Sequence, residues 1–152
     1  MRENPALQEK LNIPKRGLDS DHEGKDRVKK ILVIDDEPLL IDLMVHLLSL
    51  LGYRVDSALD HQEAAGKLKD QSYDLIFLDV KMPMMDGKSF YLKMNEHFPA
   101  LAKRIVFLTG DVGNEETFNF ILETENAYLC KPFTLKEIKN LLSRFFQESK
   151  RQ

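Results

Sequence analysis

Short apolar runs recur along the chain from residue 30 onward, and stretches with helical periodicity separate them. Four of the runs are continuously apolar, which is typical of parallel strands that are buried on both faces. The second run is weaker because charged residues interrupt it. The five runs are 31–34, 53–57, 75–78, 105–108 and 127–130. Five strand–helix repeats over 30–148 predict a doubly wound α/β fold, an open parallel sheet of five strands with helices on both sides.

The stretches between the runs carry recognisable helix ends. Pro38 suits a first helical turn, and Gly52 is placed to end that helix. Later helices are preceded by residues that can cap an N-terminus, namely Asp60, Asn114 and Thr134. Glu63 and Glu137 have capping-box spacing from the first and last of these. The final helix is expected to run to about Gln147.

The first predicted helix has more apolar residues than one face needs. Its helical period predicts that the sheet-facing residues are Leu40, Leu43, Met44, Leu47 and Leu51. Ile41 and Val45 then lie toward solvent, beside Asp42 and His46. Exposed apolar residues at helical spacing indicate docking onto a partner helix, and partial burial by neighbouring elements is the alternative.

The chain divides into three parts by composition. Residues 1–28 combine prolines and glycines with mixed charges and are expected to form a largely irregular linker or tail. Residues 29–148 hold all the strand–helix repeats and are long enough for one domain with a proper core. Residues 149–152 are left as a short C-terminal tail.

Composition limits the possible partners. The net charge of -3 gives no general attraction for nucleic acid. Asp42 and His46 interrupt the longest apolar stretch, so no segment is expected to cross a membrane. The single cysteine, Cys130, cannot form an internal disulfide, which fits a reducing compartment. We therefore expect a monomeric cytoplasmic domain that contacts neither nucleic acid nor membrane, although a longer parent chain is free to be membrane-anchored.

Reactive side chains follow four of the predicted strands. Asp35 and Asp36 come after the first run, Asp79 after the third, Thr109 after the fourth and Lys131 after the fifth. Parallel strands bring these ends to one edge of the sheet, where such folds bind ligands. Two aspartates before a helix are, by themselves, more typical of an N-cap, but the strand-end position of Asp79 favours a shared site.

Three carboxylates in one crevice require a positive charge among them. Two carboxylates about 5 Å apart repel by roughly 3 kcal/mol at an effective dielectric near 20. An oxygen-only site with few protein ligands suits Mg²⁺, which retains several waters. Lys131 adds a second positive group, Thr109 can donate a hydrogen bond to a phosphoryl oxygen, and Asp79 becomes the candidate nucleophile.

At these positions the chain resembles the receiver domains of two-component response regulators. The matching motifs, in order and spacing, are Asp35-Asp36-Glu37-Pro38, Asp79 to Gly87, Thr109-Gly110 and Lys131-Pro132-Phe133. The resemblance covers roughly residues 29–148. It implies a flavodoxin-like (βα)5 fold with strand order 2-1-3-4-5. It also implies Mg²⁺-dependent transfer of a phosphoryl group to Asp79 from a histidine kinase or a histidine phosphotransfer protein.

The resemblance implies a ligand set for the metal. Asp36 and Asp79 would bind Mg²⁺ through their side chains and Lys81 through its backbone carbonyl. Asp35 would act mainly through water.

The resemblance also implies a switch. Thr109 and Tyr128 would be the switch pair, with simple packing as the alternative for Tyr128, and the Lys131–Pro132 bond would be cis. The surface made by the fourth helix, fifth strand and fifth helix would change on phosphorylation.

The sequence also bears on the kind of parent protein and on alternative functions. About 20 residues follow Lys131, enough for one helix, and the fourth and fifth strand regions look most like receivers fused to hybrid histidine kinases. A stand-alone single-domain response regulator is the alternative. A haloacid-dehalogenase-type phosphohydrolase would need an Asp-x-Asp motif, whereas Lys81 stands two residues after Asp79. A flavin module fits poorly because the acidic first loop repels phosphate, and a degenerate receiver fits poorly because the acidic, Thr and Lys positions are all filled.

Overall fold

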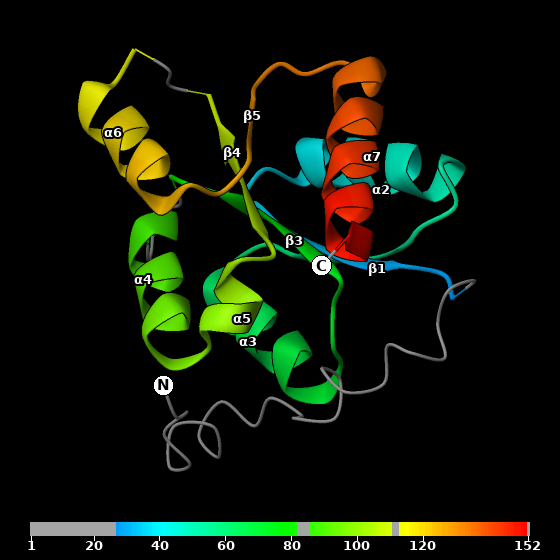
Figure 1. The fold of residues 1–152 in the computed structure, drawn as a ribbon, viewed down its shortest axis with the longest axis horizontal. Coiled ribbons are helices and arrows are strands. Elements are labelled where there is room, and N and C mark those ends of the chain that lie inside the picture. The colour runs from blue at the N-terminus through cyan, green and yellow to red at the C-terminus, as the bar shows by residue number, and fades with distance from the viewer. Residues whose placement is uncertain (1–26, 82–85, 111–112, 152) are drawn as a thin grey trace.

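A five-stranded parallel sheet in the order β2-β1-β3-β4-β5 forms the middle layer of the computed structural model (Figure 1). The structure describes residues 27–81, 86–110 and 113–151. The elements are β1 (Lys30–Ile34), α2 (Pro38–Leu50), β2 (Arg54–Ala58), α3 (His61–Asp70), β3 (Leu75–Asp79), α4 (Gly87–His97), α5 (Pro99–Ala102), β4 (Ile105–Thr109), α6 (Glu115–Thr124), β5 (Tyr128–Cys130) and α7 (Leu135–Arg151). The predicted fold class and strand order are confirmed.

Each strand divides its side chains between two cores, because successive residues of a strand point to opposite faces. Leu32, Ile76 and Phe107 pack with α3, α4, α5 and α6, whereas Val33 and Phe77 pack with α2 and α7. Figure 1 shows these two helix layers on either side of the sheet. Burial on both faces explains why β1, β3 and β4 are continuously apolar in the sequence.

The strand order reverses between β1 and β3, which are hydrogen-bonded neighbours. Their register pairs Ile34 with Leu78, so the next residues along, Asp35 and Asp79, end the two strands at the same level. A crevice at such a reversal is where open α/β sheets bind ligands. The fold alone therefore brings two of the predicted acidic residues together.

The predicted N-caps are confirmed. Asp60 accepts from the Glu63 N–H (2.8 Å), and Asn114 accepts from the Thr117 N–H (3.0 Å). The Thr134 hydroxyl accepts from the Glu137 N–H (3.1 Å), as a capping box requires. These bonds satisfy N–H groups in the first turn that have no partner inside the helix.

For the first helix, α2, the predicted sheet-facing side is confirmed for Leu40, Met44, Leu47 and Leu51, which pack in the core on the sheet, and is wrong for Leu43 and Ile41. Ile41 is 6% exposed and packs on the sheet with Met44 and Leu48, while Leu43 is 46% exposed. Val45 is half-buried against the same core. The apolar residues of α2 surround most of its circumference, so their spacing did not determine which face the sheet covers. Ile41 is thus no docking residue for a partner.

Two helical segments differ from the expectation. α7 continues to Arg151, because residues 148–151 contain no glycine or proline to end it. The short helix α5 was not predicted and begins at Pro99, which suits a first helical turn.

The described part of the chain begins at Arg27, since residues 1–26 of the predicted linker lie outside the described residues. The Arg27 guanidinium donates to both carboxylate oxygens of Asp74, at 2.6 and 3.1 Å. Asp74 precedes β3, so this contact attaches Arg27 at the end of the sheet opposite Asp79. None of the helices among the described residues is long and apolar enough to span a bilayer.

Candidate functional site

The loops that follow β1, β3, β4 and β5 surround a pocket of about 270 Å³. All four loops leave the sheet at the carboxyl ends of the strands. The residues that line the pocket are Asp36, Glu37, Asp79, Val80, Lys81, Thr109, Gly110 and Lys131. The sequence-predicted residues from four separate strands thus meet in one place, with Asp35 buried directly beneath.

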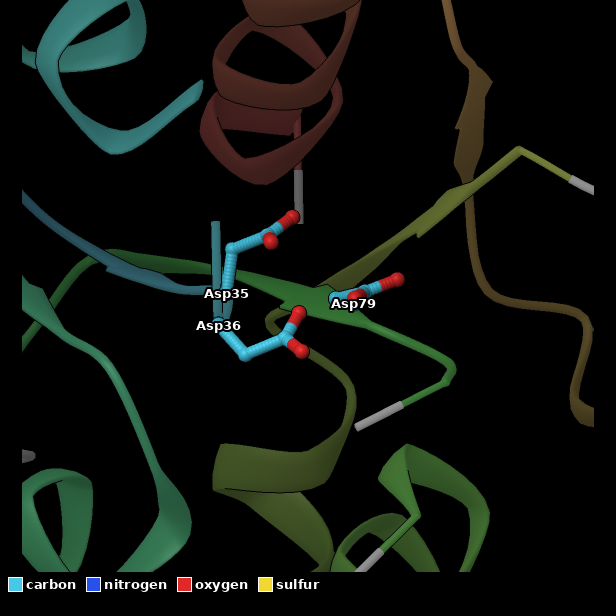
Figure 2. Close-up of side chains that lie close together, drawn as sticks. All are labelled: Asp35, Asp36 and Asp79. Carbon is cyan, nitrogen blue, oxygen red and sulfur yellow. The ribbon is translucent and has the colours of Figure 1, made fainter. Parts of the chain in front are cut away.

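Three carboxylates lie close together at the ends of β1 and β3 (Figure 2). One oxygen from each of Asp35, Asp36 and Asp79 lies within 4.8 Å of the others. Asp35 and Asp79 are buried, and Asp36 is half-exposed. Buried carboxylates this close together repel one another and need a positive partner.

Asp35 is held from two directions. Its Oδ1 accepts a hydrogen bond from the Glu37 N–H (2.9 Å), and its Oδ2 accepts one from Lys131 Nζ (2.8 Å). Through these two contacts Asp35 has a structural role, because it fixes both the loop after β1 and the position of the lysine.

Lys131 lies close to three carboxylates of the site, two in the loop after β1 and one at the end of β3. Its Nζ lies 2.8 Å from Asp35, 3.2 Å from Glu37 and 3.6 Å from Asp79. The Lys131 N–H donates to the Thr109 carbonyl (2.7 Å), and the following bond to Pro132 is cis, as the resemblance implied. The hydrogen bond to Thr109 and the ion pairs therefore hold the ammonium group beside the Asp79 carboxylate.

The electrostatics of the pocket change how readily its groups ionise. Burial, reinforced by the negative charge of Asp35, raises the pKa of Asp79 to about 7, although Lys131 and the Lys81 N–H act in the opposite direction. Burial also raises the pKa of Asp35. For Lys131 burial lowers the pKa, but the hydrogen bond to Asp35 and the charge of Asp79 outweigh it, and the net shift is upward. The lysine therefore remains charged while Asp79 titrates.

The donor atoms of the cluster suit Mg²⁺. Every candidate ligand is a carboxylate or carbonyl oxygen, which is what a hard cation prefers. Opposite ligands of Mg²⁺ stand about 4.2 Å apart. The separation limit of 4.8 Å in the cluster is close to this value, and half-exposed Asp36 has room to adjust.

The two residues that the resemblance implies as a switch pair lie at the end of β4 and the start of β5. Thr109 ends β4, is buried and lines the pocket. Tyr128 begins β5 as a half-buried ring that meets Phe118 of α6 edge to face, with 5.7 Å between ring centroids. Lys81 borders the pocket, and its N–H lies 3.4 Å from Asp79 Oδ1.

Sequence reasoning missed two contributors to the site. Glu37 pairs with Lys131, although the sequence treated it only as part of an acidic motif. Gly87 begins α4 where a Cβ atom would lie 2.8 Å from Val80 Cα and would overlap the Asp79 carbonyl oxygen. Its N–H also donates to the Val80 carbonyl (2.7 Å). The Asp86-Gly87 pair was the signal available for this close approach.

The stability of the metal-free protein is expected to depend on pH through Asp79. A carboxyl with a pKa near 7 when folded and 3.8 when unfolded binds more protons in the folded state between these values. Its contribution to stability therefore decreases as pH rises from about 4 to about 7, by up to a few kcal/mol. In EDTA, the gain in unfolding free energy caused by Asp79→Asn should grow across this range, and Mg²⁺ should increase the stability of the unsubstituted protein most at high pH. A gain that is the same at pH 5 and pH 8 in urea melts would contradict the shift.

Comparison with known proteins agrees with this description of the fold and site. Both are those of a two-component signalling module. Residues 31–143 match the family described as the response regulator receiver domain, and the chain belongs to this family. This membership removes the phosphohydrolase and flavin-module alternatives.

Two relatives and one solved structure show the range of the family. The chain is 38% identical over 117 residues to the sensor protein EvgS of Escherichia coli, covering 77% of this chain and 10% of EvgS. It is 30% identical over 129 residues to hybrid signal transduction histidine kinase L of Dictyostelium discoideum, covering 81% of this chain and 8% of the kinase. The chain thus spans a small part of both relatives.

The crystal structure of the response regulator protein TrrA from Thermotoga maritima, in complex with Mg²⁺-BeF, is also similar. The two chains superimpose with a TM-score of 0.66 at 29% identity, covering 78% of this chain and 99% of that one.

Proposed function

We propose that the chain accepts a phosphoryl group on Asp79 from the phosphohistidine of a partner protein. The observation that carries the proposal is the arrangement around Asp79: two further carboxylates with an oxygen within 4.8 Å, and the Lys131 ammonium 3.6 Å from Oδ1. Receiver domains interact with histidine kinases or histidine phosphotransfer proteins, and either is the expected partner here.

The transfer follows from the residues that surround Asp79. An Oδ atom of Asp79 attacks phosphorus while the bond from phosphorus to the partner's imidazole nitrogen breaks, and the electron pair of that bond stays with the nitrogen. Lys131 and Thr109 are placed to contact phosphoryl oxygens and balance their charge. Asp36, Asp79 and the Lys81 carbonyl would hold Mg²⁺, which supplies charge neutralisation for the phosphoryl group.

The proposal is tested with small donors in place of the partner. Incubation with Mg²⁺ and acetyl phosphate should add one phosphoryl group, stable in acid and labile in base, that intact-mass spectrometry detects. Omission of Mg²⁺ with EDTA should prevent the addition. Labelling of equal extent in EDTA would contradict the proposed role of the metal.

The partner must reach Asp79 across the rim formed by the start of α2. Leu39 is 85% exposed one residue after Pro38, and Leu43 and Leu50 continue the exposed apolar stripe along α2. A helix of the phosphohistidine protein is the occupant that we propose, because its histidine has to enter the pocket directly beside this stripe. The exposed leucines replace Ile41 and Val45 in this role.

Substitution of the stripe should separate protein donors from small donors. Leu39→Asp combined with Leu43→Asp is expected to reduce transfer from the cognate phosphohistidine protein at least tenfold, because charged groups would be buried on docking. The rate with acetyl phosphate should fall much less, because this small donor does not dock on α2 and only the added negative charge acts on it. The cognate donor is found by phosphotransfer profiling against candidate kinases. Leu92→Asp, at a leucine of α4 that is about as exposed as Leu43, is the control, and equal losses in both variants would contradict docking on α2.

Phosphorylation of Asp79 is proposed to change the surface made by α6, β5 and α7. Thr109 moves toward a phosphoryl oxygen, which leaves space for Tyr128 to turn inward. The Tyr128 ring packs against Phe118, so rotation of Tyr128 alters the contact with α6. The result is a population shift that is biased by contacts available only to the phosphorylated state.

The parent protein is proposed to be a hybrid histidine kinase, supported by the likeness to EvgS and to the hybrid kinase L. In this proposal residues 1–28 are linker and 29–148 the receiver domain. The alternative, a single-domain response regulator, is supported by TrrA, whose chain is covered almost completely. The reading frame of the parent gene separates the two. A cytoplasmic location, a monomeric state and the lack of nucleic-acid contact remain predictions from the sequence.

A further inference from the structure

Glu37 stands at the mouth of the pocket, and its backbone is fixed on both sides. Its N–H donates to Asp35 Oδ1 (2.9 Å), and Pro38 begins α2 directly after it. Glu37 is therefore the N-cap residue of α2, yet within the described residues its side chain makes no capping hydrogen bond. The carboxylate instead lies 3.2 Å from Lys131 Nζ. The side chain thus pairs with Lys131 in the pocket and does not cap the helix.

Lys131 Nζ donates hydrogen bonds to two carboxylates, Asp35 and Glu37, while Asp79 Oδ1 at 3.6 Å lies beyond hydrogen-bond distance. A phosphoryl oxygen on Asp79 attracts the ammonium group, and movement of the ammonium toward it lengthens the contact with Asp35 or with Glu37. The Asp35 contact is buried, and its loss would leave a carboxylate unpaired away from water. The Glu37 side chain is 63% exposed, so water can solvate it after release. The contact with Glu37 is therefore the one that exchanges.

We propose that Glu37 is a positioning residue that holds Lys131 in the unphosphorylated domain and releases it to the phosphoryl group. The inference rests on the proposed function and adds that the pairing of Glu37 with Lys131 slows phosphorylation of Asp79. Because Glu37 pairs with Lys131 before phosphorylation, it favours the unphosphorylated state. Its charge at the mouth also repels incoming anions, and more strongly the greater their charge.

Two substitutions separate the effect on Lys131 from the effect of the charge. Glu37→Gln keeps the shape of the side chain and removes the charge. Glu37→Asp keeps the charge and shortens the reach to Lys131. Glu63→Gln is the matched control, since Glu63 forms an exposed pair with Lys67 (3.9 Å) on α3 and does not line the pocket.

The rates of phosphorylation are measured with Mg²⁺ and two donors, acetyl phosphate, a dianion at pH 7.5, and phosphoramidate, mostly a monoanion there. Glu37→Gln is expected to accelerate labelling by acetyl phosphate about two- to five-fold, the range that exposed ion pairs support. The acceleration with phosphoramidate should be smaller, and high salt should remove the difference. Glu37→Asp should accelerate both donors by the same factor, because the mouth keeps its charge.

Several results would overturn the proposal. A folded Glu37→Gln variant with unchanged or slower labelling by acetyl phosphate excludes the restraint, and so does a Glu63→Gln variant that gains equally. If circular dichroism shows that Glu37→Gln is unfolded, unchanged rates in folded Glu37→Asp exclude it instead. Failure of the unsubstituted protein to be labelled would overturn the proposed function as well, whereas normal labelling with no effect of Glu37 removes this inference alone.

Discussion

Asp79→Asn is expected to abolish phosphorylation, because an amide oxygen is too poor a nucleophile to form an acyl phosphate. It should also raise the stability of the metal-free protein at neutral pH. Burial is the main reason for the raised pKa of Asp79, and repulsion from Asp35 is the second. An amide at position 79 carries no charge, so the substitution removes both penalties from a cluster of three carboxylates, two of which are buried. Mass spectrometry after incubation with acetyl phosphate and Mg²⁺ measures the first effect, and urea melts in EDTA measure the second.

The control for this substitution is Asp70→Asn, at an exposed aspartate at the end of α3. It should leave labelling unchanged and alter stability by less than about 0.5 kcal/mol. Phosphoryl addition that persists in Asp79→Asn at the unsubstituted rate would place the nucleophile on another residue. A lower unfolding free energy of Asp79→Asn in EDTA would show that the carboxylate of Asp79 does not destabilise the metal-free protein.

Gly87→Ala is expected to destabilise the domain by about 1–3 kcal/mol, because the new methyl group has no space. Its Cβ would lie 2.8 Å from Val80 Cα and overlap the carbonyl oxygen of Asp79, and neither backbone atom can rotate away as a side chain would. Relief of the overlap requires the start of α4 to move away from the end of β3, or Asp79 and Val80 to shift. We therefore also expect slower phosphorylation and weaker Mg²⁺ binding, measured by acetyl phosphate kinetics and by metal titration.

A second glycine gives a matched comparison. Gly66 lies in α3, where an added methyl group would have no neighbouring atom within 4 Å, so Gly66→Ala adds only helix propensity. This variant should be more stable than the unsubstituted protein by up to about 1 kcal/mol and should be phosphorylated normally. If the two alanine variants had equal melting temperatures, the tight contact at Gly87 would be refuted.

The sequence was sufficient to predict the sheet and most of the pocket. β1, β3 and β4 are buried on both faces, so their continuously apolar runs differ clearly from the helical stretches. A polar residue at the carboxyl end of such a run lies at one edge of a parallel sheet. Asp35, Asp79 and Thr109 could therefore be placed at one edge from the order of the runs alone. Caps at Asp60 and Asn114 were predictable for a related reason, since their hydrogen bonds span three residues.

The errors arose where neighbours in space decide the outcome. α2 is apolar on nearly every side, and the sheet and α7 determine that Ile41 is buried and Leu39 is not. The pairing of Glu37 with Lys131 joins residues that are 94 positions apart, and local spacing carries no information about it. Gly87 acts through contact with the backbone after β3, which a sequence pattern cannot measure.

The two hydrogen bonds from Arg27 to Asp74 have a practical consequence for attaching the domain to other molecules. β3 runs from Leu75 to Asp79, so Arg27, bound to Asp74, and the carboxylate of Asp79 are at opposite ends of the same five-residue strand. A strand of this length covers roughly 16 Å. A fluorescent reporter or surface tether joined ahead of Arg27 is thus held at the far pole of the sheet, and the entrance used by an incoming donor stays open.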